Sequence, residues 1–319
     1  MFKNLKATLR SKDRTIVFTE GTDHRILSSA ARLTEEGLLG VILLGNPDEV
    51  KAAADKGQFD ISKCQIIDPE NYPDMEEMVQ QMVELRKGKM TEEKVRAALK
   101  QSNYFGTMLV KMGKADCLLG GATYSTADTV RPALQLIKTR PGNKSVSSVF
   151  VMIKGDEILG FADCSINIKP DEDELAEIAV ETAKTMRIFG VEPRVAMLSY
   201  STLGSGKGET VDMMRNATEK AKAMDPDLII DGEIQFDAAL SDEVASIKCP
   251  GSPVAGKANV FVFPDINAGN IGYKIAARLG GYEAVGPVLQ GLNASLNDLS
   301  RGCNADEVYK MSIITGALS

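Results

Sequence analysis

Short runs of apolar, β-branched residues alternate along the first half of the chain with longer stretches of helical periodicity. The runs predict strands, and they occupy residues 15–20, 40–46, 64–69 and 115–121. The stretches between and after them predict helices over residues 24–37, 47–57, 75–88, 91–100 and 125–140. This alternation is typical of an α/β protein whose mostly parallel sheet is covered by helices on its faces.

The segment TRPGNKS, residues 139–145, is rich in turn-forming residues and is the best candidate for a domain boundary. After it, two strand patterns are joined by a Gly-Asp turn. The amphipathic stretch 171–190 predicts a helix whose first turn is acidic and whose end is marked by Gly190. The remaining strands and helices, which run to about residue 281, predict a second α/β unit.

Composition places the chain among ordinary globular proteins. It has 319 residues, of which 44% are hydrophobic and 25% charged, and its formal net charge is −7. The negative charge argues against broad contact with nucleic acid or anionic membrane, because both require a basic face. The first residues lack the apolar stretch of a signal peptide, and no apolar run approaches the ~20 residues that span a bilayer. We therefore expect a cytoplasmic protein.

Residue counts also limit the chemistry. The five cysteines are odd in number and include no C-x-x-C pair, which argues against a disulfide framework or a zinc site. The single histidine, His24, begins an amphipathic stretch and is expected at the surface. Catalytic groups are therefore sought among Ser, Arg, Asp and Glu.

Three loops place small, polar and basic residues where ligands of parallel sheets bind. The first, residues 120–131, has two glycines, a Ser/Thr cluster and Arg131, and it predicts either an anion site or an ordinary helix cap with a surface arginine. The second, residues 199–208, is not a P-loop, because Gly208 follows the lysine. The third, residues 297–307, carries Ser300 and Arg301 ahead of a last helix that begins near Asp306.

Seven segments together resemble the phosphate acetyltransferase family, which also includes phosphate butyryltransferases. In chain order they are FGTMLVKMGKAD, STADTVRPALQ, FADCSINIKP, DGEIQFDAAL, FVFPDINAGNIGYK, GPVLQGL and NDLSRGC. The resemblance implies two three-layer α/β domains with mostly parallel sheets and an inter-domain cleft. The first domain would comprise residues 1–140 and about 294–319, and the second residues 141–293. It also implies a homodimer.

The resemblance implies that coenzyme A and acetyl phosphate react directly, without an acyl-enzyme and without a tightly bound cofactor. The substrates are then coenzyme A or acetyl-CoA, and phosphate or acetyl phosphate. A thiol with a pKa near ~8.5 is only a few per cent thiolate at neutral pH. A carboxylate base beside it would supply the reactive form, and an arginine would neutralise the phosphate that leaves.

Family roles carried over by position make Ser300 the residue that orients the thiol or the acetyl carbonyl, and Arg301 the one that binds the phosphoryl group. Arg131 matches a coenzyme A or phosphate contact, and Arg86 a basic residue near the 3′-phosphate of coenzyme A. The matching segments also give further expected substrate-binding residues, namely Ser125, Thr126, Asn270 and Lys274.

The position of the base departs from the family pattern. Members usually carry Asp seven residues after the serine of SRG, where this chain has Glu307 and places Asp306 one residue earlier. Successive helical residues point about 100° apart, so one of the two acids should face the site, and we expect Glu307 ahead of Asp306. Tyr124 stands where many members have His. Cys164 and Cys303 are expected to be small apolar fillers.

Three other functions remain open. The substrate could carry a longer acyl group, such as butyryl. The chain could be a non-catalytic acyl-CoA-binding regulatory module, as the related domain fused to malic enzymes is thought to be. It could also be a metal-dependent decarboxylating dehydrogenase whose ligands come from four acids, namely Asp231, Glu233, Asp237 and Asp242.

Overall fold

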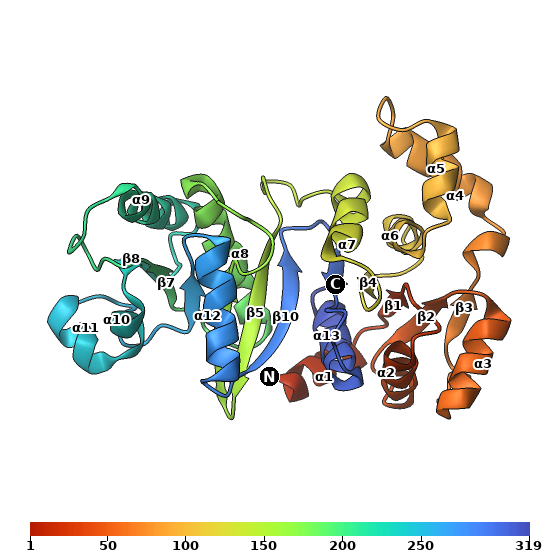
Figure 1. Cartoon of the computed structure of the whole chain (residues 1–319), viewed down its shortest axis with the longest axis horizontal. Helices are drawn as coiled ribbons and strands as arrows, with labels where there is room; N and C mark the ends of the chain where they lie inside the picture. Colours follow the sequence, from red (N-terminus) through yellow and green to blue (C-terminus); the bar gives the residue numbers. More distant parts are fainter. The chain divides into compact units, whose positions relative to one another are not determined.

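The computed structural model describes all residues from 1 to 319, and the chain divides into two compact units. Unit 1 comprises Met1–Pro141 and Leu292–Ser319, and unit 2 comprises Gly142–Gly291. Unit 1 is discontinuous because the chain leaves it for unit 2 and then returns (Figure 1).

The sheet of unit 1 has five parallel strands in the order β11-β4-β1-β2-β3. Its strands are β1 (Thr15–Phe18), β2 (Gly40–Leu44), β3 (Gln65–Ile67), β4 (Cys117–Gly120) and β11 (Ser295–Asp298). The chain passes from β1 to β2 and β3 on one side and then places β4 on the other side of β1. The direction of winding therefore switches between β1 and β4, which is where open α/β sheets bind ligands.

Helices cover both faces of this sheet. Helices α2 and α13 contact the strands on one face, and α6 and α7 contact them on the other (Figure 1). The helices of unit 1 are α1 (Phe2–Arg10), α2 (His24–Glu35), α3 (Pro47–Gly57), η1 (Pro69–Asn71), α4 (Met75–Leu85), α5 (Glu92–Leu99), α6 (Ser102–Lys111), α7 (Thr126–Pro132), η2 (Ala133–Ile137) and α13 (Ala305–Ala317).

Helix α7 is shorter than its sequence pattern predicts. It ends at Pro132, and the chain continues as the π-helical turn η2. Proline has no N–H to donate and its ring crowds the preceding turn, so the regular hydrogen-bond ladder is interrupted there.

The sheet of unit 2 has six strands in the order β10-β5-β6-β9-β7-β8. The pairs β10–β5 and β5–β6 are antiparallel and the other pairs are parallel. The strands are β5 (Ser147–Lys154), β6 (Glu157–Ala162), β7 (Val195–Leu198), β8 (Ile230–Ile234), β9 (Val260–Val262) and β10 (Glu283–Gln290). The helices are α8 (Glu172–Ile188), α9 (Glu209–Met224), α10 (Phe236–Leu240), α11 (Asp242–Lys248) and α12 (Ile266–Arg278).

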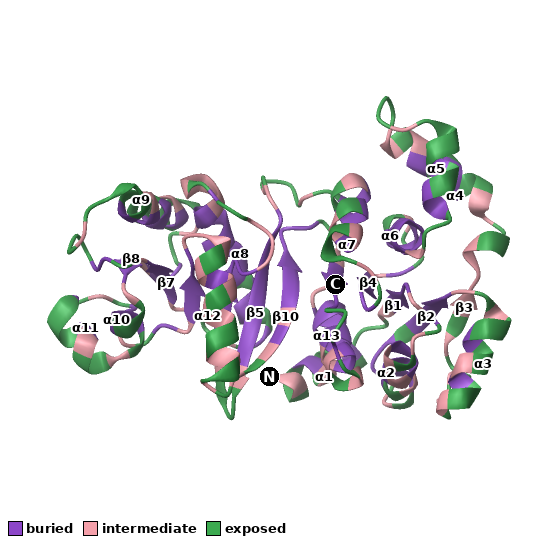
Figure 2. Ribbon diagram, in the orientation of Figure 1, coloured by how far each residue is buried: buried purple, intermediate pink, exposed green.

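Apolar side chains fill both faces of the unit 2 sheet. Figure 2 shows its central strands and much of α8 as buried. On one face, α8 buries a stripe that includes Leu175, Ile178 and Met186. On the other, Phe150, Phe161 and Phe261 belong to an aromatic-rich cluster against which α12 packs. Sheets covered on both faces in this way make each unit a three-layer α/β structure, as predicted.

The prediction of an α/β protein with mostly parallel sheets is confirmed, and most of the expected elements are present. Helices α1 and α6 and strands β10 and β11 were not predicted. Of the two strand patterns joined by the Gly-Asp turn, the second corresponds to β6, which ends at Ala162, and the residues after it form a loop.

Candidate functional site

Three loops meet at the carboxyl edge of the unit 1 sheet, after β1, β4 and β11. The loop after β1 carries Glu20, whose carboxylate accepts hydrogen bonds from the backbone N–H of Thr123 at 2.9 Å and from its hydroxyl at 3.2 Å. The backbone N–H of Leu299, after β11, donates to the carbonyl of Gly120 at 2.7 Å. These bonds fix the three loops to one another at the topological switch point.

Arg25, in the first turn of α2, joins the same loops. Its guanidinium forms a two-pronged ion pair with Asp23 and donates to the carbonyl of Ala122 at 2.9 Å. It also donates to the carbonyls of Arg301 at 2.9 Å and Cys303 at 3.1 Å. Burial acts to raise the pKa of Asp23, but the bonds from Arg25 outweigh it and lower that pKa.

Ser300 and Arg301 follow β11 directly, and both are exposed. The Ser300 hydroxyl accepts a hydrogen bond from the backbone N–H of Gly302 at 3.2 Å. The loop is fixed through its backbone by Arg25, and Arg301 itself is exposed. An arginine presented in this way can bind an oxyanion through its fork of N–H donors.

The two acids of the last helix have different environments. Asp306 lies on the outer side of α13 and forms ion pairs with Arg32 at 3.3 Å and Lys310 at 2.8 Å, and Lys310 above all lowers its pKa. Glu307 forms a capping box with Asn304, in which its carboxylate accepts from the Asn304 N–H at 3.1 Å. Glu307 is therefore held at the start of α13 by Asn304, whereas Asp306 is paired with Arg32 and Lys310.

The residues expected on α7 lie beside this loop. Ser125 occupies the N-cap position, but its hydroxyl donates to Asp128 and caps no backbone N–H. Thr126 donates to Asp298, the last residue of β11, at 2.6 Å. Arg131 is exposed apart from a long contact of 3.5 Å with Asp128, so its side chain is available to a ligand.

Two carboxyl groups, the half-buried Glu20 and the buried Asp298, underlie the loops. Burial raises the pKa of Glu20, and it raises the pKa of Asp298 to about 6. Tyr124 lies between them, and its hydroxyl is 2.8 Å from that of Thr19. Burial also raises the pKa of Tyr124, so it remains a neutral hydroxyl at physiological pH.

Arg86 lies at the end of α4. It is half-buried and donates to the carbonyl of Gln135 in η2 at 3.4 Å. This contact holds the Arg86 side chain against the backbone of η2. The role expected for Arg86 at coenzyme A stays a prediction.

Asn270 and Lys274 lie one turn apart on α12 of unit 2. The Asn270 amide donates to the carbonyl of Cys164, and Lys274 donates to the Asn270 side-chain oxygen at 2.7 Å. Lys274 also lies 5.7 Å from the centre of the Tyr273 ring. The two expected substrate contacts are thus coupled to each other within unit 2.

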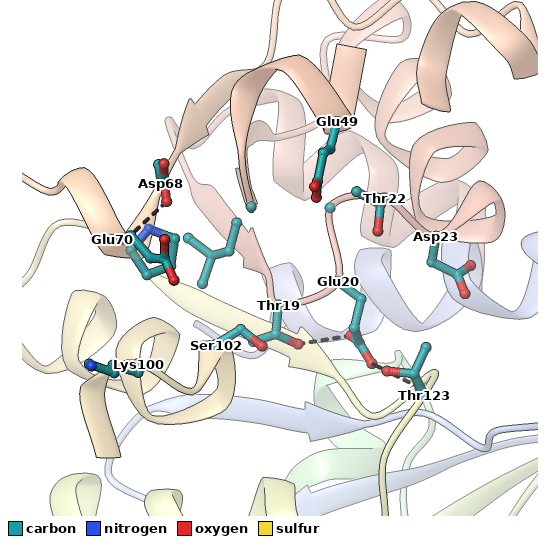
Figure 3. Close-up of a pocket in the computed structure, with 14 residues that line it drawn as sticks. Thr19, Glu20, Thr22, Asp23, Glu49, Asp68, Glu70, Lys100, Ser102 and Thr123 are labelled. Carbon is teal, nitrogen blue, oxygen red and sulfur yellow. Dashed lines mark hydrogen bonds between the residues drawn. The ribbon is translucent and has the colours of Figure 1, made fainter. Parts of the chain in front are cut away.

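A cavity of about 460 Å³ opens beside Glu20, along the carboxyl ends of β1, β2 and β3 (Figure 3). Its charged lining residues are Glu20, Asp23, Glu49, Asp68, Glu70 and Lys100. Five carboxylates against one ammonium group make it unfavourable for phosphate groups. Anionic ligands are better served by Arg131 and Arg301 than by this cavity.

The cysteines of the chain, and the four acids of unit 2 that were considered as metal ligands, have contacts within the fold and form no metal site. All five cysteines are free, and Cys164 and Cys303 are buried, as expected of apolar fillers. The four acids considered as metal ligands form no cluster. Glu233, for example, accepts hydrogen bonds from Ser201 and Gly204 and pairs with Arg215.

Sequence reasoning missed three residues that organise the site, namely Glu20, Arg25 and Asp298. Glu20 ends a strand pattern at the ligand-binding edge of a parallel sheet, so its position carried a usable signal. Asp298 carried none, because the strand that it ends, β11, is not predicted by the sequence. Arg25 carried none for its contacts with the loops, because those partners are backbone carbonyls distant in sequence.

Comparison with known proteins gives a consistent result. The Phosphate acetyl/butaryl transferase family model matches residues 1–316. A phosphate acetyltransferase of Bacillus subtilis (strain 168) is 53% identical over 317 residues, covering 99% of this chain and 98% of that protein. A crystal structure of a phosphotransacetylase from Streptococcus pyogenes has a TM-score of 0.97 at 54% identity, covering 99% of this chain and 97% of that one.

A more distant structure shares the fold. A branched-chain phosphotransacylase from Enterococcus faecalis V583 has a TM-score of 0.68 at 18% identity, covering 95% of this chain and 99% of that one. The fold and the loops at the sheet edge define a two-unit α/β protein with an exposed arginine after β11. The chain belongs to the phosphate acetyl/butyryl transferase family.

Proposed function

We propose that this protein is a phosphate acetyltransferase, which converts acetyl-CoA and phosphate into coenzyme A and acetyl phosphate, and the reverse. The observation that carries the proposal is the loop after β11, where exposed Arg301 adjoins Ser300 and the backbone is held by Arg25. Relatives more than 50% identical over nearly the whole chain bear this name. No helix is long and apolar enough to cross a membrane.

In the direction of thioester synthesis, the thiolate sulfur of coenzyme A attacks the carbonyl carbon of acetyl phosphate. A carbon–sulfur bond forms, the bond between that carbon and the bridging oxygen breaks, and phosphate leaves. The Arg301 guanidinium binds the phosphoryl oxygens and stabilises the charge that develops on them. Ser300 orients the thiol or the acetyl carbonyl, and Arg131 provides a second cation for phosphate or coenzyme A.

The thiol proton goes to a carboxylate, for which we propose Glu307. Asp306 is a weaker candidate, because its two cationic partners hold the pKa of its carboxyl below the ordinary range. Glu307 uses one carboxylate oxygen to cap α13, and the other is available to accept a proton. General base catalysis of this kind typically contributes ~10²–10⁴-fold in rate.

The remaining expected contacts belong to the same proposal. Ser125 and Thr126 would line the substrate site from α7, Asn270 and Lys274 would contribute from α12, and Arg86 would contact the 3′-phosphate of coenzyme A. Coenzyme A acts as a substrate, and the reaction as written needs no tightly bound cofactor or metal. We further propose a cytoplasmic protein that does not bind nucleic acid.

The test is a direct assay of acetyl-CoA formation from coenzyme A and acetyl phosphate. We expect wild-type turnover and a loss of about 10²-fold or more in Arg301→Ala, since an oxyanion-stabilising donor is typically worth that much. Arg278→Ala, which removes an arginine at the end of α12, is the control and should retain activity. Near wild-type turnover in Arg301→Ala would refute the assigned site.

The same assay separates the alternatives. Butyryl phosphate should react more slowly than acetyl phosphate, although one or two methylenes discriminate by only ~1–3 kcal/mol each. Faster reaction with butyryl phosphate would assign the longer substrate instead. Tight binding of acetyl-CoA without turnover would support the regulatory module.

We also propose a homodimer, for which α12 supplies a suitable face. Ile271, Ile275 and Leu279 recur every fourth residue on this helix and are 57%, 53% and 84% exposed. Such an apolar stripe on a helix is normally covered. Sedimentation should give a dimer for the wild type and a monomer for Ile275→Glu, whereas Lys220→Glu on α9 should remain dimeric; a monomeric wild type would refute this proposal.

A further inference from the structure

Asp298 is a buried acid without a cationic partner. It ends β11, two residues before Ser300, and its side chain is 1% exposed. One carboxylate oxygen accepts from the hydroxyl of Thr126 at 2.6 Å, and the other from the hydroxyl of Thr129 at 2.5 Å. Both donors lie in the first turn of α7, so the carboxylate joins this helix to the end of β11.

The backbone around Asp298 is built to accommodate the carboxylate. A Cβ at Gly121 would collide with a carboxylate oxygen of Asp298 and lie 3.0 Å from the backbone of Leu299. Gly121 adopts φ = +97°, which glycine adopts readily and other residues do not. The loop after β4 therefore leaves room for Asp298 at the point where α7 begins.

A chain of hydroxyl groups connects Asp298 to a second acid, the half-buried Glu20. The Tyr124 hydroxyl lies 2.8 Å from that of Thr19, which itself donates to Glu20 at 2.8 Å, and it interacts with the hydroxyl of Thr129, which donates to Asp298. The charged or titratable groups that act on Asp298 are Glu20 from the loop after β1, Tyr124 from the loop after β4, and Asp128 from α7. All three are acidic or neutral.

Burial of a carboxylate without a cation is unfavourable, and a neutral side chain of the same shape would stabilise the fold. The arrangement therefore calls for a reason other than stability. The two elements that it joins carry the expected phosphate ligands, Arg131 on α7 and Arg301 after β11.

We propose that Asp298 is a positioning residue for acyl transfer, whose carboxylate holds the first turn of α7 in register with the loop that carries Ser300 and Arg301. The role rests on the proposed function. When the carboxylate is ionised, both of its oxygens accept from α7. When it is protonated, one oxygen becomes an O–H donor, so Thr126 or Thr129 must reverse its role and accept, and both bonds lose their charge-assisted strength, which loosens the connection.

The test compares wild type with Asp298→Asn in acetyl-CoA synthesis, measured from pH 5 to 8. We expect kcat to fall by about 10²-fold with little change in KM, since misplacement of reacting groups by about 1 Å costs that much. In the wild type, kcat should decline below pH about 6, where Asp298 takes up its proton, and this acidic limb should be absent from Asp298→Asn. Asp116→Asn, at the opposite end of β4, is the matched control and should keep the wild-type kcat and profile.

A second pair of variants tests the connection without altering the acid. Thr129→Val removes the hydroxyl and keeps the shape, and it should lower kcat, whereas Thr129→Ser keeps the hydroxyl and should retain it. An unchanged kcat and pH profile in Asp298→Asn, or equal activity of the two Thr129 variants, would overturn the positioning role alone. A wild type that binds coenzyme A but shows no turnover would overturn the proposed function, and the role of Asp298 with it.

Discussion

The guanidinium of Arg25 donates to the main-chain carbonyl of Arg301 at 2.9 Å. Helix α2, near the start of the chain, therefore holds the loop that precedes the last helix, α13. The same guanidinium also binds the carbonyls of Ala122 and Cys303. Three carbonyls from two loops converge on one planar group. The position of the Arg301 side chain therefore depends on a residue that precedes it by more than 270 positions.

Replacement of Arg25 should loosen this loop. In Arg25→Ala we expect kcat to fall by about 10²-fold, because a shift of about 1 Å in Ser300 or Arg301 suffices. Stability should fall by about 1–3 kcal/mol, because partly buried carbonyls and Asp23 lose their partner. Arg25→Lys should resemble alanine in activity, since an ammonium group cannot reach all three carbonyls at once.

The measurement is kcat together with thermal unfolding. Arg10→Ala, on α1, removes an exposed arginine with one 4.0 Å contact and should behave as wild type in both. Full activity in a folded Arg25→Ala would show that the loop keeps its conformation unaided.

The two acids of α13 can be separated by amide substitutions. Gln at the third helical position supports a capping box as Glu does, so Glu307→Gln keeps the fold of the helix terminus and removes the base. We expect kcat to fall by ~10²-fold or more. Asp306→Asn removes only exposed ion pairs with Arg32 and Lys310 and should change kcat little.

Single-turnover measurements would confirm that the loss lies in the chemical step. The opposite ranking of the two variants would move the base to Asp306. Equal and small effects would indicate that coenzyme A reaches its thiolate form without either acid.

Most of the fold could be predicted from periodicity, and the exceptions have physical reasons. Strand β10 contains Gly286 and Pro287 and has an irregular register between Val285 and Val288, so its sequence does not read as a strand. Strand β11 is only four residues long, and its buried Asn297 and Asp298 are polar. A strand that buries acids and amides cannot be found from an apolar pattern.

Only part of the candidate site could be predicted from the sequence. The regions around Ser125 and Ser300 could be identified, because ligands of parallel α/β sheets generally bind in the loops that follow the strands. The capping box between Asn304 and Glu307 is local and leaves a signal in the sequence. The ion pair of Asp306 with Arg32 of α2 is not recorded in the local pattern, because the two residues lie far apart in the chain.

Asp298 should make stability depend on pH in a direction opposite to that of most acids. Its pKa in the folded state is raised from 3.8 to about 6, so the folded protein binds the proton more tightly than the unfolded chain does. Its contribution thus favours the folded state fully below pH 3.8 and is lost as the pH rises through about 6. The difference corresponds to about 3 kcal/mol.

Asp298→Asn is neutral at every pH and should escape this loss. We expect the variant to unfold at a higher temperature than wild type at pH 8 and at a similar temperature at pH 4, as measured by calorimetry. Asp116→Asn, in which an ion pair with Arg14 is lost, should show no gain at pH 8. A less stable Asp298→Asn at pH 8 would mean that the carboxylate is better solvated than its burial implies.

Gly121 and Gly142 form a matched pair that isolates one steric contact. They adopt φ = +97° and +95°, so alanine at either position carries a comparable backbone penalty of ~1–2 kcal/mol. A Cβ at Gly142 meets nothing within 4 Å, whereas one at Gly121 meets the Asp298 carboxylate and the backbone of Leu299. Gly121→Ala should therefore be destabilised by more than Gly142→Ala in urea unfolding. It should also lower kcat, because Asp298 cannot move without displacing Ser300 or releasing Thr129. Equal losses of stability with unchanged kcat would show that the end of β11 yields to the added methyl group without disturbing the site.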